Sequence, residues 1–179
     1  SILFEKEENA LKDITSGLQF STPDDFINTL GANLSAAADG LWDDSTWLHG
    51  CIGWRMPLCG WRAAYVGDVL GWNTRAISHF DAYAKSQVTN VEPIYPHPSQ
   101  DSTNNLARGE EKWGTQMYSN GYICRYPNRN DNMNHYDMNL NYIDELLWHF
   151  SYDADTVMMK RLWPVLKRNI EWEKRNWDP

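Results

Sequence analysis

The chain has 179 residues, enough for one domain with an ordinary core, and a formal net charge of −8. This acidic balance excludes nucleic acid as the expected partner, because phosphates require clustered lysine and arginine. No apolar run approaches the roughly 20 residues that span a bilayer, and residues 1–4 lead into charged residues rather than into a signal peptide. We therefore predict no nucleic-acid partner and no membrane partner.

Residues 1–20 form a lead-in segment without firm periodicity. A helix is expected from about residue 24 to 40, because Ser21–Asp25 combines a hydroxyl cap, an early proline and acids at the positive helix end. Gly40 suits its end. At helical spacing, its expected buried stripe consists of Phe26, Ile27, Leu30 and Leu34.

Residues 41–60 are rich in glycine, proline and tryptophan and read as a loop. His49 in this loop is a candidate acid or base, with a structural role as the alternative. The spacing of the three cysteines excludes a zinc site, and buried thiols are favoured over a Cys51–Cys59 disulfide. We predict no metal and no cofactor.

A second helix is expected from about Trp61 to Lys85, although Gly67 and Gly71 weaken the pattern. Arg62 and Asp68 flank its apolar face. Beside aromatic rings, such a pair can hold a polar ring such as a sugar. The alternative is a buried helix in which the two charges are paired with each other or with the backbone.

Residues 87–136 keep neither a helical nor a strand period. Long irregular stretches are either functional or disordered, and the aromatic residues here argue against disorder. We therefore expect an ordered, site-forming loop. Glu110 or Glu111 is the predicted general acid, because desolvation in an aromatic-rich loop would raise the pKa of a carboxyl group. A solvated loop in which these charges accompany Lys112 is the alternative.

Helical order returns at Asp137, a candidate catalytic carboxylate whose alternative role is helix capping. The expected stripe of this helix is Leu140, Ile143, Leu147 and Phe150, broadened by Leu146 and Trp148, which leaves Asp144 and Glu145 exposed. A turn with a capping aspartate separates it from a helix over Thr156–Asn176, which Pro164 kinks or begins. The predicted class is all-α, with helices grouped as hairpins.

Two passages resemble the six-hairpin glycosidases, whose catalytic domain is an (α/α)6 toroid. Gly60–Trp72 is similar to the Gly-Trp-x-Gly-Asp passage of bacterial α-L-rhamnosidases. The second passage runs from Asp137 to Phe150 and then from Asp153 to Trp172, and it resembles their helix–turn–helix that ends in a "WPVLK…EW" helix, here Leu162–Lys167 and after. The resemblance covers residues 24–179 and implies that residues 21–179 are part of a toroid. Two hairpins cannot close a six-hairpin ring, so we expect a second chain, or the remainder of the same polypeptide, to complete it.

The resemblance implies a periplasmic or extracellular glycoside hydrolase that acts on poly- or oligosaccharides through paired carboxyl groups. Trp61 stands where the rhamnosidase pattern has its glutamate acid, whereas Arg62 and Asp68 match the pattern. The catalytic candidates in this chain are therefore Glu110, Glu111, Asp137 and Asp68. The expected substrate-binding residues are Arg62, Trp61, Trp54, His49, Trp113 and Tyr118.

Two other functions stay open. One is a polysaccharide lyase on the same toroid, with a base among Tyr118, Tyr122, His135 and Tyr136. The other is a helical carbohydrate-binding protein without catalysis. A lyase would release products that absorb in the ultraviolet, whereas a hydrolase would not.

Overall fold

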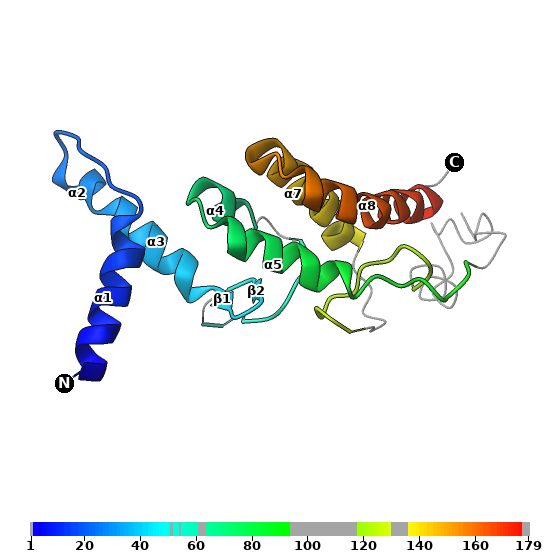
Figure 1. Cartoon of the computed structure of the whole chain (residues 1–179), viewed down its shortest axis with the longest axis horizontal. Coiled ribbons are helices and arrows are strands. Elements are labelled where there is room, and N and C mark those ends of the chain that lie inside the picture. Colours follow the sequence, from blue (N-terminus) through cyan, green and yellow to red (C-terminus); the bar gives the residue numbers. More distant parts are fainter. Residues whose placement is uncertain are drawn as a thin grey trace, which may run out of the picture.

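A computed structural model describes residues 2–50, 52–53, 55–60, 64–93, 118–129 and 136–176. Most of them are helical, and the helices are α1 (Ile2–Ser16), α2 (Asp25–Asn28), α3 (Leu30–Gly40), α4 (Ala64–Val69), α5 (Asn73–Ala84), α7 (Tyr136–Asp153) and α8 (Thr156–Asn176). The strands β1 (Trp42–Asp43) and β2 (Thr46–Trp47) form a short antiparallel hairpin. The helical class is confirmed (Figure 1), and the toroid stays a prediction.

The helices α1, α2 and α3 form an arm at one end of the molecule (Figure 1). α1 packs on α3, and no residue of α1 is buried. The helix expected over 24–40 is divided at Thr29, and its cap is Asp24, whose Oδ1 accepts a hydrogen bond from the N–H of Phe26. The predicted buried stripe is wrong, because these side chains are exposed: Phe26, Ile27, Leu30 and Leu34.

The arm buries small residues instead of large ones. Gly31 lies so close to the carbonyl of Leu18 that a Cβ there would meet its oxygen at 2.2 Å. Ser35 and Ala38 are buried on the same helix, α3. Small side chains let the backbones approach, and this close approach turns the apolar residues of α2 and α3 toward solvent.

The helix expected over 61–85 is two helices, α4 and α5. Gly71 between them has a φ of +70°, a conformation that favours glycine, and the N–H of Trp72 bonds to the carbonyl of Gly67 at 2.7 Å. The chain thus reverses and forms a helical hairpin. The prediction of a single helix is wrong, and the break lies at Gly71, one of the two glycines that weakened the helical pattern.

The helices α4 and α7 lie side by side and run in the same direction. Gly60 packs on the backbone of Tyr142, and the hydroxyl of Tyr65 bonds to the carboxylate of Asp144 further along α7. α8 returns antiparallel to α7, capped by Asp155, whose Oδ1 accepts the N–H of Val157 at 2.8 Å. The predicted capping aspartate and the bounds of α8 are confirmed, and Pro164 lies inside the helix.

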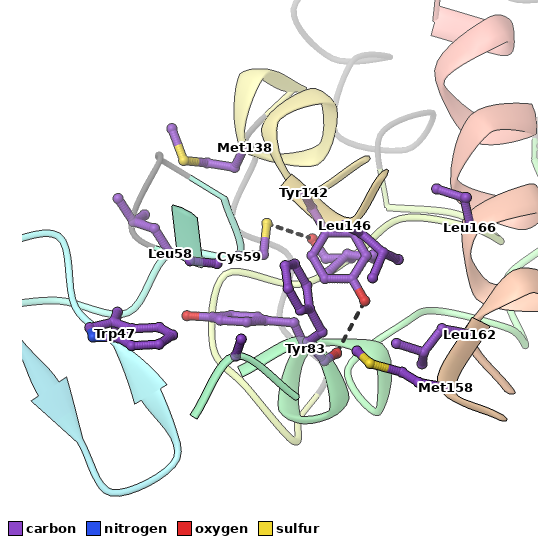
Figure 2. Packing of buried hydrophobic residues seen from close by; sticks show 14 residues of the cluster. Trp47, Leu58, Cys59, Tyr83, Met138, Tyr142, Leu146, Met158, Leu162 and Leu166 are labelled. Atoms are coloured by element: carbon purple, nitrogen blue, oxygen red, sulfur yellow. Dashed lines mark hydrogen bonds between the residues drawn. The ribbon is translucent and has the colours of Figure 1, made fainter. Parts of the chain in front are cut away.

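The main core lies between α5, α7 and α8 and the β1–β2 hairpin. Figure 2 shows Tyr83, Tyr142 and Leu146 among its buried side chains, with Trp47 at one side. The hydroxyl of Tyr142 donates to the carbonyl of Phe80 at 3.1 Å. Cys59 in this core and Cys124 are buried free thiols, as predicted, and Cys51 lies outside the described residues.

The predicted stripe of α7 is rotated from the observed one. Leu140 and Leu147 are exposed, although both were expected in the core. The residues of α7 that the structure buries are instead Met138, Asn139, Tyr142, Glu145, Leu146 and His149. Leu146 of the predicted stripe is among them, and Ile143 and Phe150 pack against the core from its edge. Four of the six buried residues carry polar groups, so a periodicity that counts only apolar residues misplaces the centre of the buried face.

Candidate functional site

Three segments that are distant in sequence meet at the amino-terminal end of α7. A Cβ on Gly60 would lie 2.6 Å from the carbonyl carbon of Asn141, so the chain before α4 touches α7 directly. The thiol of Cys59 and the carbonyl of Ile123 are 4.0 Å apart. We call this meeting point, formed by Cys59–Gly60, Ile123 and Asp137–Asn141, the amino-end site.

Asn139 holds the second segment onto α7. Its Oδ1 accepts the N–H of Ile123 at 2.8 Å, and its Nδ2 donates to the carbonyl of the same residue at 3.1 Å. Asn169 of α8 donates to Asn139 Oδ1 at 2.8 Å and to the carbonyl of Gly121 at 3.0 Å. The two buried asparagines thus add to the antiparallel bridge between Gln87 and Ile123, and together these contacts fix residues 121–123. The ordered, site-forming loop over 87–136 stays a prediction, because most of it lies outside the described residues.

Asp137 is exposed in the first turn of α7. Its backbone carbonyl accepts a hydrogen bond from Asn141 Nδ2 at 2.8 Å. The side-chain carboxylate takes no part in this bond. Nearby in the chain, Arg125 contacts the sulfur of Met56 and packs over the ring of Tyr126, 5.6 Å from its centroid. Asp137 is therefore an accessible acid at the amino-end site, and Arg125 and Tyr126 belong to the loop segment that follows Ile123.

Asp68 lies elsewhere, in the interior between α4 and α7. Its Oδ1 is 2.5 Å from Nδ1 of His149, and both side chains are 1% exposed. The Nε2 of His149 is 4.0 Å from Oδ2 of Asp153, nearer the surface. Asp68 therefore orients a histidine, a partner that the sequence did not indicate.

Asp68 and Asp137 do not form a catalytic pair with each other. His149, the partner of Asp68, follows Asp137 by twelve residues on one helix, which is about 18 Å along the axis. Paired carboxyl groups in glycosidases stand about 5–9.5 Å apart. Asp68 therefore cannot be the partner of Asp137 in the predicted pair of carboxyl groups.

Glu145 is the acidic residue that sequence reasoning missed. It was predicted to be exposed, but its side chain is 1% exposed on the inner face of α7. Its charge helps to raise the pKa of the Cys59 thiol, after burial as the main cause, and adds to the burial that raises the pKa of Tyr83. The spacing of Tyr142, Glu145 and His149 along one face could have located it, because all three share the buried side.

His79 and Tyr83 complete a polar region inside the core. Burial lowers the pKa of His79 from 6.5 to about 3, against an opposing effect of the Cys59 carbonyl, so the ring is neutral at pH 7. Its Nδ1 accepts the N–H of Trp47 at 3.2 Å. This histidine holds the β1–β2 hairpin and has no free path to solvent, since it is fully buried.

Of the expected substrate-binding residues, His49 and Tyr118 are described, and both are half-buried. The N–H of His49 bonds to the carbonyl of Met56 at 3.0 Å, and Tyr118 packs on the ring of Tyr122. Neither is brought to Asp137 by a contact in the structure. The other predicted site residues lie outside the described residues: Trp54, Trp61, Arg62, Glu110, Glu111 and Trp113.

No family model, curated protein or solved structure matches the chain. Within the described ranges, no group of three or more histidine, cysteine or acidic side chains could hold a metal ion. No helix described here is long and apolar enough to cross a bilayer. Function is therefore inferred from the residues and their geometry.

Proposed function

We propose that the chain is part of the catalytic domain of a six-hairpin glycoside hydrolase that cleaves glycosidic bonds of a poly- or oligosaccharide. The supporting observation is that the two passages carrying the resemblance pack on each other. Gly60 lies on α7 at Asn141, and Asp68 of the same passage binds His149. The hairpins α4–α5 and α7–α8 lie side by side with their first helices, α4 and α7, parallel. A toroid repeats helical hairpins in this arrangement.

In this proposal, Asp137 supplies one carboxyl group of the hydrolytic pair. It is the described catalytic candidate whose side chain reaches solvent at the amino-end site. Glu110 or Glu111 supplies the proton, as the sequence predicts. Asp68 is a positioning residue, which holds His149 and thereby α7 rather than touching the sugar.

Exposed apolar surface supports a larger assembly of helices. On α7, Leu147, Trp148 and Tyr152 are all more than 40% exposed, and on α8 Trp163 is half exposed. The rings of Trp148 and Tyr152 pack 5.7 Å apart, centroid to centroid, and grouped apolar side chains of this kind mark surfaces that pack against other elements. Further hairpins, from a second chain or from the same polypeptide, would cover them in a complete toroid.

The test begins with the intact mass of every polypeptide in the purified sample, followed by a panel of aryl glycosides and neutral oligosaccharides. We expect release of the aglycone, and a loss of at least about 100-fold for Asp137→Asn, since acid–base groups contribute about 10²–10⁴-fold. The double variant Glu110→Gln/Glu111→Gln should lose activity comparably. Asp25→Asn is the matched control, because Asp25 is an exposed acid in the first turn of α2, in the arm and away from the amino-end site.

Unchanged hydrolysis in Asp137→Asn would remove this residue from the proposed pair, and unchanged hydrolysis in the double glutamate variant would remove the proposed acid. Products that absorb in the ultraviolet would instead show a lyase. Carbohydrate binding without turnover, unchanged by the substitutions at Asp137, Glu110 and Glu111, would show a carbohydrate-binding protein. Tyr122 offers little to the lyase, because it is buried against Trp172.

A further inference from the structure

A second candidate site lies at the opposite end of the α4–α5 hairpin from the amino-end site. A cavity of about 450 Å³ opens between the end of α1 and the start of α5. Its lining consists of Asp13, Ile14, Gly71, Trp72, Asn73, Thr74 and Arg75. The volume lies within the range of about 300–1,000 Å³ that small-molecule sites occupy.

Trp72 is held in place before any ligand binds. The Cζ of Arg75 lies 4.6 Å from the centroid of the Trp72 ring and 5.3 Å from that of Trp42. Nη2 of Arg75 is 2.7 Å from Oδ1 of Asp39, so the guanidinium group is fixed by an ion pair and by two rings. A platform that is already ordered costs a ligand little conformational entropy.

The cavity also offers polar groups without partners. The side chains of Asp13, Asn73 and Thr74 are exposed and make no side-chain hydrogen bond within the described residues. A carboxylate accepts, whereas an amide and a hydroxyl both donate and accept. Together with the indole ring and Ile14, the lining can bind a molecule that is apolar on one face and carries hydroxyl groups at its edge.

Charge decides between classes of ligand. The positive charge of Arg75 is matched by Asp39, and Asp13 is the remaining charged group of the lining. An anion would meet an unmatched carboxylate and is therefore disfavoured. A neutral sugar presents the required hydroxyl groups without this repulsion.

We infer that this cavity, formed by Asp13, Trp72, Asn73 and Thr74, is a secondary binding site for a neutral sugar ring. The inference rests on the proposed function only for the choice of carbohydrate. The site is separate from Asp137, since it joins α1 to the Gly71 turn, whereas Asp137 begins α7. It would hold a sugar unit of a polymeric substrate away from the place of cleavage.

Saturation-transfer NMR and isothermal titration with neutral methyl glycosides (α-L-rhamnoside, β-D-galactoside, β-D-glucoside and β-D-xyloside) test the site in the full chain. We expect binding of at least one glycoside in the millimolar range. Asn73→Ala and Asp13→Asn should each weaken it about tenfold, the effect of one lost hydrogen bond. Trp72→Phe should weaken it by a similar factor while keeping a ring for Arg75 to pack on.

The matched controls are Asn90→Ala and Trp163→Phe, which remove an exposed amide and a half-exposed indole elsewhere and should leave binding unchanged. Circular dichroism checks the fold of each variant. The inference is overturned if no neutral glycoside binds, if the cavity variants bind like the controls, or if glucuronate or choline binds there instead.

Loss of hydrolysis in Asp137→Asn with retained sugar binding supports the two proposals separately. Sugar binding that depends on Asn73 in a chain without any hydrolytic activity would support this inference and contradict the proposed function. Hydrolysis that depends on Asp137, together with sugar binding that Asn73→Ala leaves unchanged, would support the proposed function and contradict this inference.

Discussion

Nδ1 of His149 lies 2.5 Å from Oδ1 of Asp68, and this contact joins α4 to α7 across 81 positions of sequence. Both side chains are almost fully buried, and the ring of Phe80 packs 5.3 Å from that of His149, centroid to centroid. Water cannot screen an interaction in such surroundings. The pair therefore acts as a polar cross-link inside an otherwise aromatic core.

Removing one member of this pair is expected to destabilise the fold strongly. Asp68→Ala should lower the free energy of unfolding by about 3–5 kcal/mol, because it leaves a buried polar group without its partner. Asp43→Ala is the control, since its ion pair with Arg55 is exposed at 3.4 Å and contributes about 0–1 kcal/mol. Urea unfolding measures both, and equal effects of the two substitutions would contradict a structural role for the buried pair.

Gly67 is expected to tolerate no side chain. A Cβ at this position would lie 2.4 Å from the ring of Trp47, which is itself fully buried and cannot move away. Gly67→Ala should therefore cost about 1–3 kcal/mol in thermal or urea unfolding, as overpacked cores do. Gly40→Ala, in a helix with open space around the new methyl group, should be neutral or slightly stabilising. The reverse order would show that the α4–β2 contact is looser than described.

The two hydrogen bonds between Asn139 and Ile123 predict a local effect on the loop. Asn139→Ala leaves both the N–H and the carbonyl of Ile123 without their bonds, and should cost about 2–4 kcal/mol. Hydrogen exchange of residues 119–124 should accelerate more than that of α8. Asn141→Ala on the same helix loses one exposed hydrogen bond and serves as control. A uniform acceleration of hydrogen exchange across the whole chain would instead indicate global destabilisation, and would contradict a local role of Asn139 in holding Ile123.

Glu173 predicts a pH dependence of stability. It is 6% exposed, and burial raises its pKa from 4.5 to about 7. Its protonated form is favoured in the folded state, so its contribution is fully present below about pH 4.5 and is lost as the pH rises through 7. Glu173→Gln should match the native protein at pH 4 and exceed its stability by up to about 3 kcal/mol at pH 8.

Urea unfolding of the native protein and of Glu173→Gln across pH 4–8 measures this difference directly, because other titrating groups cancel in the comparison. Glu171→Gln, an exposed acid on the same helix, should show no comparable trend. A constant difference between native protein and Glu173→Gln at all pH values would mean that Glu173 ionises normally.

The sequence alone determined the local features of this protein. Helical class, the capping role of Asp155 and the bounds of α8 follow from propensity, caps and turn residues that act within a few positions. The weak pattern at Gly71 also marked the break between α4 and α5. Such signals are local, so a single sequence contains them.

The tertiary structure decided which faces are buried and which polar groups meet. Periodicity placed Leu34 and Leu147 in the core, and both are exposed, because close packing of Gly31 on Leu18 and the inward Glu145 and His149 rotate the helices. The pairing of Asp68 with His149 depends on how α4 lies on α7, a relationship without any local signal. Burial is a property of neighbours in space, and those neighbours are far apart in sequence.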